Sequence, residues 1–169
     1  GDFLKPVGNI EPDQLRDAFA AQAAALKKGG ADGFIIETMT AIEEVELAIE
    51  AVRQISDEPV FVSLAYDWTQ NSARTMMGIS CQDAVRRLAD KNISAIGFNC
   101  GTCDMDQYIT LAQNYKEAVT SAGLDLAIMA EPNAGKPRIE GSSTVYKLSP
   151  EDFADYGAKI TDSGVSIIG

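Results

Sequence analysis

The sequence contains no histidine, and this absence narrows the chemistry that its 169 residues can perform. Ser-His-Asp hydrolases, Cys-His enzymes and zinc sites with imidazole ligands all require this residue. Imidazole is also the side chain that most readily exchanges protons near neutral pH. Any reaction within this chain must therefore use cysteine, carboxylate, tyrosine, lysine, asparagine or backbone groups.

Cysteine is scarce as well, with three residues in the whole chain. So small and odd a number does not suit a disulfide-stabilised secreted domain, and we expect a protein of the reducing cytoplasm. Cys100 and Cys103 form a C-x-x-C pair, which occurs in dithiol redox proteins and in structural zinc sites. A thioredoxin-like fold has too few parallel strand units to match this chain, and the second half of a structural zinc site is missing.

Long apolar runs and basic patches are missing too. The longest apolar runs are far shorter than the roughly 20 residues of a membrane helix, and Asp2 and Lys5 interrupt any signal-peptide core. Fourteen basic against 25 acidic residues give a net charge of −11, so we expect neither a nucleic acid nor a membrane as partner. Ala134-Gly135-Lys136-Pro137 resembles a phosphate-binding loop but lacks its first glycine and its hydroxyl residue.

Five short apolar runs recur along the chain. Their apolar residues are continuous rather than alternating, which predicts strands that are buried on both faces. The runs span residues 33–37, 59–66, 94–100, 125–131 and 164–169.

Between these runs lie segments with helical periodicity, in which apolar residues recur three and four positions apart. Residues 15–26, 42–52 and 84–89 follow this spacing. Predicted helix starts are Thr40 with Glu43, Ser80 with Asp83, and Ser149-Pro150, and predicted exits are Gly29-Gly30, Gly123 and Gly164. Alternating strands and helices predict one α/β domain over residues 1–169, either an open doubly wound sheet or part of a (β/α)8 barrel.

Four of the predicted strands end in polar side chains that could form one site. In parallel α/β folds, function collects at the carboxyl ends of the strands. Each residue has a purely structural explanation, since Glu37 could cap a helix, Asn99 could satisfy loop backbone and Asn133 could hold a turn. As a set they indicate a polar site over the mouth of a barrel; the strand ends are Glu37-Thr38-Met39, Tyr66-Asp67-Trp68, Asn99-Cys100-Gly101 and Glu131-Pro132-Asn133.

An ordered set of motifs covers essentially the whole chain, and together they resemble the homocysteine S-methyltransferase family, above all its homocysteine-binding barrel modules that work with cobalamin. No single motif is specific, but their order is. The motifs are Gly1-Asp2-Phe3-Leu4, Ile36-Glu37-Thr38-Met39, Arg74-Thr75-Met76-Met77-Gly78, Gly97-Phe98-Asn99-Cys100-Gly101, Pro132-Asn133-Ala134-Gly135, Tyr146 and Gly164-Val165-Ser166-Ile167-Ile168-Gly169.

The resemblance implies a (β/α)8 barrel, of which this chain carries about units four to eight without the last helix. It further implies a zinc ion held by three cysteine thiolates that binds homocysteine or a related thiol. Cys100 matches the first ligand, and the other two belong to a Gly-Gly-Cys-Cys segment expected beyond Gly169. Glu37 matches a contact to the substrate amino group, and Asp2 matches a second one. We place Asn99 and Asn133 with them as substrate-binding residues at neighbouring strand ends.

The methyl donor is not encoded in a readable way; family members use a methylated corrinoid protein, S-methylmethionine or betaine. We expect a methylcorrinoid on a separate module. The aromatic segment 66–74 and the extra thiol of Cys103 depart from the family pattern, so a corrinoid-pathway barrel with a different donor or acceptor is an alternative. A non-catalytic barrel fragment is another. An unclosed sheet has two free edges, which we expect the missing barrel units or another chain to cover, and the isolated piece should be inactive.

Overall fold

The computed structural model describes residues 4–169, and its centre is a five-stranded parallel sheet. The strands lie in the order β1 (Phe34–Met39), β2 (Val60–Leu64), β5 (Ala95–Asn99), β6 (Ala127–Glu131) and β9 (Ile167–Ile168). Each strand therefore pairs with the strand that follows it in this series, and the order never reverses. A doubly wound sheet reverses its order at a switch point, whereas a barrel does not. The predicted α/β class is confirmed, and the strand order is that of a partial barrel.

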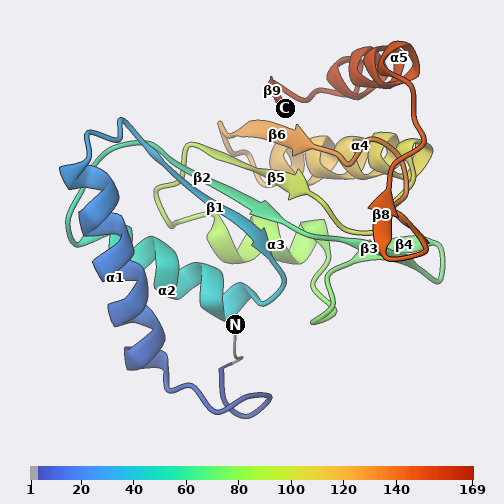
Figure 1. Cartoon of the computed structure of the whole chain (residues 1–169). Coiled ribbons are helices and arrows are strands. Elements are labelled where there is room, and N and C mark those ends of the chain that lie inside the picture. The colour runs from blue at the N-terminus through green and yellow to red at the C-terminus, as the bar shows by residue number, and fades with distance from the viewer. Residues whose placement is uncertain (1–3) are drawn as a thin grey trace.

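Five helices connect and cover the strands. They are α1 (Pro12–Lys28), α2 (Ile42–Arg53), α3 (Cys81–Leu88), α4 (Met105–Ser121) and α5 (Pro150–Asp162). In Figure 1, α3 and α4 lie behind the sheet, and no helix covers the face that is turned to the viewer. The buried core forms between the sheet and these helices, with Phe34, Val62 and Phe98 on the strands and Val45 and Leu111 on the helices.

Two of the three predicted helix starts are confirmed. The hydroxyl groups of Ser80 and Ser149 accept the backbone N–H three residues on, which satisfies donors that the first helical turn leaves free. The prediction for Thr40 is wrong, because α2 starts one residue later, after Ala41, and carries no side-chain cap. The three predicted glycine exits have left-handed backbone at Gly30, Gly123 and Gly164.

Two small antiparallel hairpins, which the sequence did not predict, follow strands β2 and β6. They are β3 (Asp67–Thr69) with β4 (Ser72–Arg74), and β7 (Arg138–Glu140) with β8 (Ser143–Val145). Figure 1 shows both beyond the carboxyl ends of the main strands. Gln70 and Asn71 both have positive φ, 47° and 68°, as a type I′ hairpin turn requires. The long aromatic segment 66–74 is therefore an ordered hairpin at the rim of the sheet.

An aromatic cluster fixes the carboxyl end of β5 against α4. The Tyr115 hydroxyl donates to the carbonyl oxygen of Gly97 at 3.0 Å, and the hydroxyl groups of Tyr66 and Tyr115 lie 2.7 Å apart. The ring of Phe98 stacks on that of Tyr108 with centroids 5.6 Å apart. Because all of these side chains are buried and the hydroxyls are paired, the end of β5 is a rigid platform.

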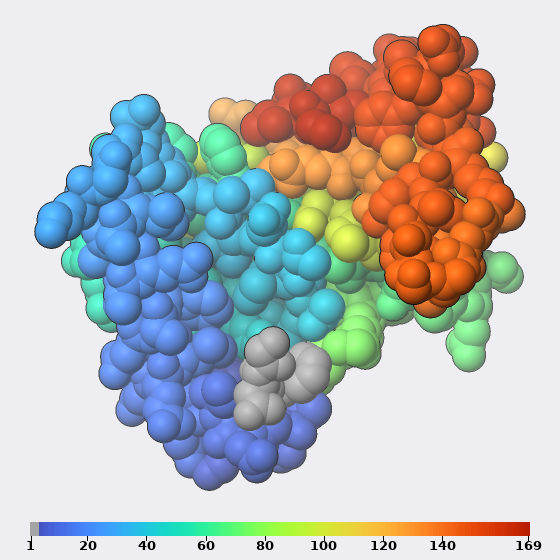
Figure 2. All heavy atoms as spheres, in the orientation of Figure 1, coloured from blue at the N-terminus to red at the C-terminus, as the bar shows by residue number. Residues whose placement is uncertain are grey.

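The face of the sheet opposite the helices is open over β1. Ile35 is 45% exposed although it lies within a strand. Figure 2 shows this face between the blue N-terminal part and the orange and red C-terminal part. The edge strands of the sheet are β1 and β9. Among residues 4–169, no helix combines the length and the apolar character needed to cross a bilayer.

Candidate active site at the carboxyl ends of the strands

The predicted polar residues collect at one edge of the sheet because the five strands run parallel. Glu37 and Asn99 lie at the ends of β1 and β5, and Cys100 directly follows β5. Asn133 lies two residues after Glu131, the last residue of β6. Asp2, the remaining predicted contact, lies outside the described residues. The structure therefore brings four of the five predicted residues to the same edge.

Cys100 occupies a sharp turn that is held on several sides. Its backbone has φ of 51° and that of Gly101 has φ of 79°, both in the left-handed region. A Cβ atom at Gly101 would lie 2.1 Å from the carbonyl oxygen of Tyr66, so only glycine fits there. The Tyr108 hydroxyl donates to the Cys100 carbonyl at 2.5 Å, and Asn133 Nδ2 donates to the Gly101 carbonyl at 3.0 Å. The backbone is thus fixed while the Cys100 thiol is exposed.

Cys103, the other thiol of the C-x-x-C pair, has a different environment. It is fully buried, and its Sγ lies 3.5 Å from the carbonyl oxygen of Tyr66. Burial, with smaller contributions from Asp67 and Asp104, raises the pKa of this thiol to about 12. Since a metal ligand or nucleophile must be a thiolate, Cys103 is poorly suited to either role and Cys100 is the accessible candidate.

Two carboxylates accompany the thiol. Glu37 is exposed on β1, where a register shift between Ile36 and Met39 marks a bulge in the pairing with β2. Glu131 lies across the sheet on β6, and burial together with the charge of Glu37 raises the pKa of its carboxyl group. Among the described residues, Glu131 Oε2 is buried and has no hydrogen-bond partner. Burying such an oxygen costs free energy unless a ligand or a cation supplies its missing partner.

Asn99 lies below these groups and is almost completely buried, with 7% of its surface exposed. Its Oδ1 accepts the Thr38 N–H at 2.9 Å and the Ser63 hydroxyl at 2.7 Å. Its Nδ2 donates to Thr38 Oγ1 at 2.6 Å. The amide that was predicted to contact substrate therefore makes its hydrogen bonds to residues of strands β1 and β2.

The described residues do not by themselves form a metal centre, since no three Cys, Asp or Glu side chains among them are grouped to hold an ion. Cys100 alone supplies an exposed thiol at the strand ends. Its N–H donates to the carbonyl of Glu131 at 3.2 Å, and a Cβ at Gly169 would lie 3.2 Å from Glu131 Cγ. The end of β9 is thus two strands away from Cys100, on the same edge, which is where the remaining predicted ligands would enter.

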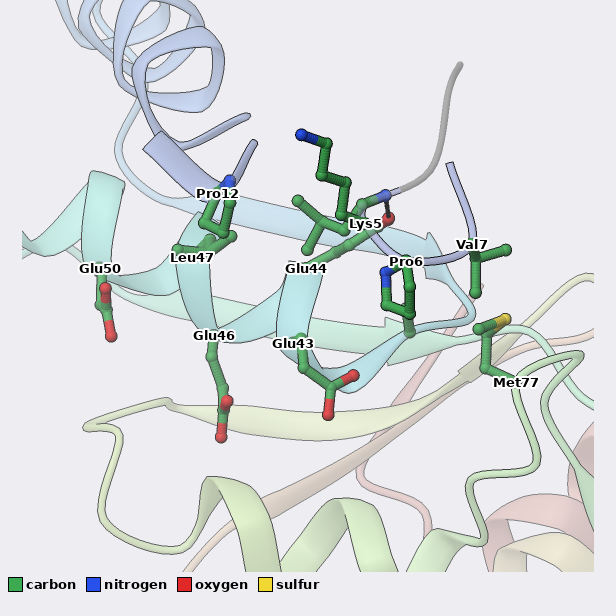
Figure 3. A pocket seen from close by; sticks show the side chains of 12 residues that line it. Lys5, Pro6, Val7, Pro12, Glu43, Glu44, Glu46, Leu47, Glu50 and Met77 are labelled. Carbon is green, nitrogen blue, oxygen red and sulfur yellow. Dashed lines mark hydrogen bonds between the residues drawn. The ribbon is translucent and has the colours of Figure 1, made fainter. Parts of the chain in front are cut away.

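A separate cavity of about 390 Å³ lies outside the sheet, between α2 and the N-terminal loop. In Figure 3, Glu43, Glu46 and Glu50 project from α2 while Pro6 and Val7 reach in from the loop. No strand-end residue named above lines this cavity. The candidate active site is therefore the polar edge of the sheet and not this acidic groove.

Comparison with known proteins shows the family of the chain. The sequence profile described as Homocysteine S-methyltransferase matches residues 1–169. The chain belongs to the homocysteine S-methyltransferase family. Methionine synthases of Mycobacterium leprae (strain TN) and Mycobacterium tuberculosis (strain ATCC 25618 / H37Rv) are each 25% identical over 175 residues. These matches cover 100% of this chain but 14% of each relative, so the chain corresponds to a small part of their length.

Solved structures of other proteins have a similar fold to this chain. The homocysteine methyltransferase MmuM from Escherichia coli matches in its apo form with a TM-score of 0.71 at 20% identity, over 95% of this chain and 52% of MmuM. Its metallated form matches with a TM-score of 0.67 at 22% identity, over 91% and 46%. A 2,3-dimethylmalate lyase matches with a TM-score of 0.65 at 12% identity, over 93% of this chain and 61% of the lyase. The chain thus spans about half of the MmuM fold.

Sequence reasoning missed one residue of this edge and gave two others no role of their own. Thr38 and Glu131 were among the predicted strand ends without an individual role, and Ser63 was not predicted at all. Thr38 and Ser63 bind Asn99, and the charge of Glu37 acts on Glu131. Ser63 lies within an apolar run, so its position cannot be found from residue spacing.

Proposed function

We propose that the protein containing this chain transfers a methyl group to the thiol sulfur of homocysteine or a closely related thiol. Family membership over residues 1–169 supports the reaction class. The observation that carries the proposal is the exposed Cys100 thiol on a fixed turn, with the carboxylates of Glu37 and Glu131 at the same edge. A thiol ligand together with carboxylates suits a substrate that has both a sulfur atom and an ammonium group.

We infer that Cys100 is one of three cysteine ligands of a zinc ion, with the other two located beyond Gly169. A zinc ion held there would lower the pKa of the substrate thiol, which is near 8.5 in solution, while leaving the sulfur nucleophilic. The one ligand that this chain would contribute suits this ion, because the Cys100 thiol is accessible and its backbone is held by Tyr108 and Glu131. We leave Cys103 out of the ligand set, because its side chain is fully buried and its Sγ lies 3.5 Å from the carbonyl oxygen of Tyr66.

The residues of this chain have distinct tasks in the proposed reaction. Glu37, with Asp2 as a second contact, binds the substrate ammonium, and Asn133 holds the turn that presents Cys100. As the new bond from sulfur to the methyl carbon forms, the bond from that carbon to the donor breaks, and its electron pair stays with the donor. The proton of the thiol is released to solvent. We propose a methylcorrinoid, on a separate module, as the donor.

The test is a methyl-transfer assay with the full-length protein, homocysteine as acceptor, and methylcobalamin, S-methylmethionine or betaine as donor. We expect methionine to form with methylcobalamin, and the product to depend on bound zinc. Formation of methionine from one of the other donors would refute the corrinoid assignment alone. No methionine from any donor, with homocysteine failing to bind, would refute the proposed reaction.

A further inference from the structure

The side-chain amide of Asn99 joins three strand ends. Strands β1 and β5 are not neighbours, because β2 lies between them. Asn99 on β5 nevertheless makes two hydrogen bonds to Thr38 on β1 and one to Ser63 on β2, between 2.6 and 2.9 Å. Ser63 is fully buried and Asn99 nearly so, which shields their bond from solvent, whereas Thr38 is exposed and its two bonds to Asn99 are part-buried. We call these three residues the Asn99 clamp.

Thr38 needs such a partner because its backbone is unusual. Its φ of 59° lies in the left-handed region, which a β-branched residue rarely adopts. It sits in the β1 bulge, where the pairing steps from Ile36 with Val62 to Met39 with Leu64, three residues against two. Bulges re-aim side chains and recur beside active sites. The bond from the Thr38 N–H to Asn99 Oδ1 fixes the bulge in one conformation.

The clamp connects the two residues that carry the proposed chemistry. Thr38 directly follows Glu37, and Asn99 directly precedes Cys100. Both Thr38 and Cys100 have left-handed backbone, so a small change at either would re-aim its neighbour. We infer that Asn99 is a positioning residue, which with Thr38 and Ser63 sets the Glu37 carboxylate relative to the Cys100 thiol and so makes the site select thiols that carry an ammonium group. This inference rests on the proposed function.

The activity test is a double-mutant cycle in the full-length protein. The variants are Ser63→Ala and Asn99→Ala, each alone and combined with Glu37→Gln. The readout is the KM for 4-mercaptobutanoate divided by the KM for homocysteine. 4-Mercaptobutanoate is homocysteine without its amino group. Loss of a net hydrogen bond predicts a drop of about two- to tenfold in this ratio for each clamp variant. With Glu37→Gln already present, the clamp variants should change the ratio no further, since the carboxylate they position is gone.

Ser56→Ala is the matched control. Ser56 is also a buried serine, but its hydroxyl accepts the N–H of Glu58 ahead of β2, at the other end of the sheet. It should leave the KM ratio unchanged even where it lowers stability. A general structural role of the clamp would instead raise KM for both thiols alike, or would reduce the ratio equally with and without Glu37→Gln. Either result would overturn the inference.

Hydrogen exchange separates failure of the clamp from failure of the proposed function. The Thr38 amide should be protected in the full-length protein without substrate, and Asn99→Ala should abolish that protection. Asn99→Asp, which keeps an acceptor oxygen, should restore most of it. If Asn99→Ala does not fold, Ser63→Ala should still weaken the protection of Thr38. An unprotected Thr38 amide in the wild-type protein would refute the clamp, whereas absence of homocysteine binding with Thr38 protected would refute the function alone.

Discussion

Replacing Glu37 by glutamine should weaken the binding of homocysteine more than that of a thiol without an amino group. Glutamine keeps the shape of glutamate and loses its charge, so the variant removes the ionic part of the contact to the substrate ammonium. A hydrogen bond with a charged partner contributes about 1.5 to 3 kcal/mol. At about 1.4 kcal/mol per tenfold, this range corresponds to roughly a 10- to 150-fold increase in KM.

The lower end of that range applies to this site. Glu37 is exposed in the described chain, so solvent screens its charge. Glu131 supplies a second negative charge nearby, which remains when Glu37 is neutralised. We therefore expect an increase of about tenfold in KM for homocysteine. KM for 4-mercaptobutanoate should change by less than about twofold, because that thiol has no ammonium group to lose a partner.

The assay compares KM for both thiols in the wild-type full-length protein, Glu37→Gln and Glu117→Gln. Glu117 is an exposed glutamate on α4 that does not line the strand-end site, so it controls for the loss of one negative charge. Equal changes for the two thiols in Glu37→Gln would remove this residue from the ammonium site. An equal effect of Glu117→Gln would show that overall charge, and not a contact, controls binding.

Three further results are expected. In the full-length protein, Cys100→Ala should lose bound zinc, measured by mass spectrometry of the metal, while Cys103→Ala keeps it; equal losses would refute the ligand assignment. Glu131→Gln should raise the urea midpoint at pH 7 without substrate. The pKa of Glu131 is raised in the folded state, so its carboxyl group stabilises the fold below its unfolded pKa and loses that contribution as pH rises through the folded pKa. Glutamine carries no charge and avoids this loss at pH 7. The gain should vanish below about pH 4, where both states are protonated, and a constant gain would refute the sign. Residues 1–169 alone should associate through the β1 and β9 edges and bind no zinc tightly, and a monomer in sedimentation with tight zinc binding would contradict this.

The sequence was sufficient to predict the strands and the edge at which they end. Continuous apolar runs such as residues 94–100 form strands of the parallel sheet, in which both faces of a strand can be buried. The caps at Ser80 and Ser149 were predictable since a cap depends only on residues within one turn. In each case the signal lies within a few neighbouring positions.

What the sequence did not predict depends on contacts between distant segments. The hydrogen bonds between Asn99 and Thr38 join residues 61 positions apart, on strands β5 and β1, which are separated by β2. The bulge at Thr38 changes the register of β1 without changing its apolar pattern, so it cannot be predicted from the spacing of apolar residues. Helix α2 starts at Ile42, and the carbonyl of Thr40 just before it accepts a hydrogen bond from the hydroxyl of Thr75, 35 positions away.

The geometry of the site and the assembly of the sheet depend on the same hydrogen bonds. Holding a residue such as Thr38 or Cys100 in the left-handed region costs about 1 to 3 kcal/mol. At Thr38, two hydrogen bonds with Asn99 offset that cost. At Cys100, the N–H donates to the carbonyl of Glu131, and the carbonyl accepts the hydroxyl of Tyr108. Each of these hydrogen bonds contributes about 0.5 to 1.5 kcal/mol. The balance is near zero, so neither turn is stable unless its neighbouring strands are in register. The proposed site is therefore set once the sheet forms, and substrate meets groups that are already in position.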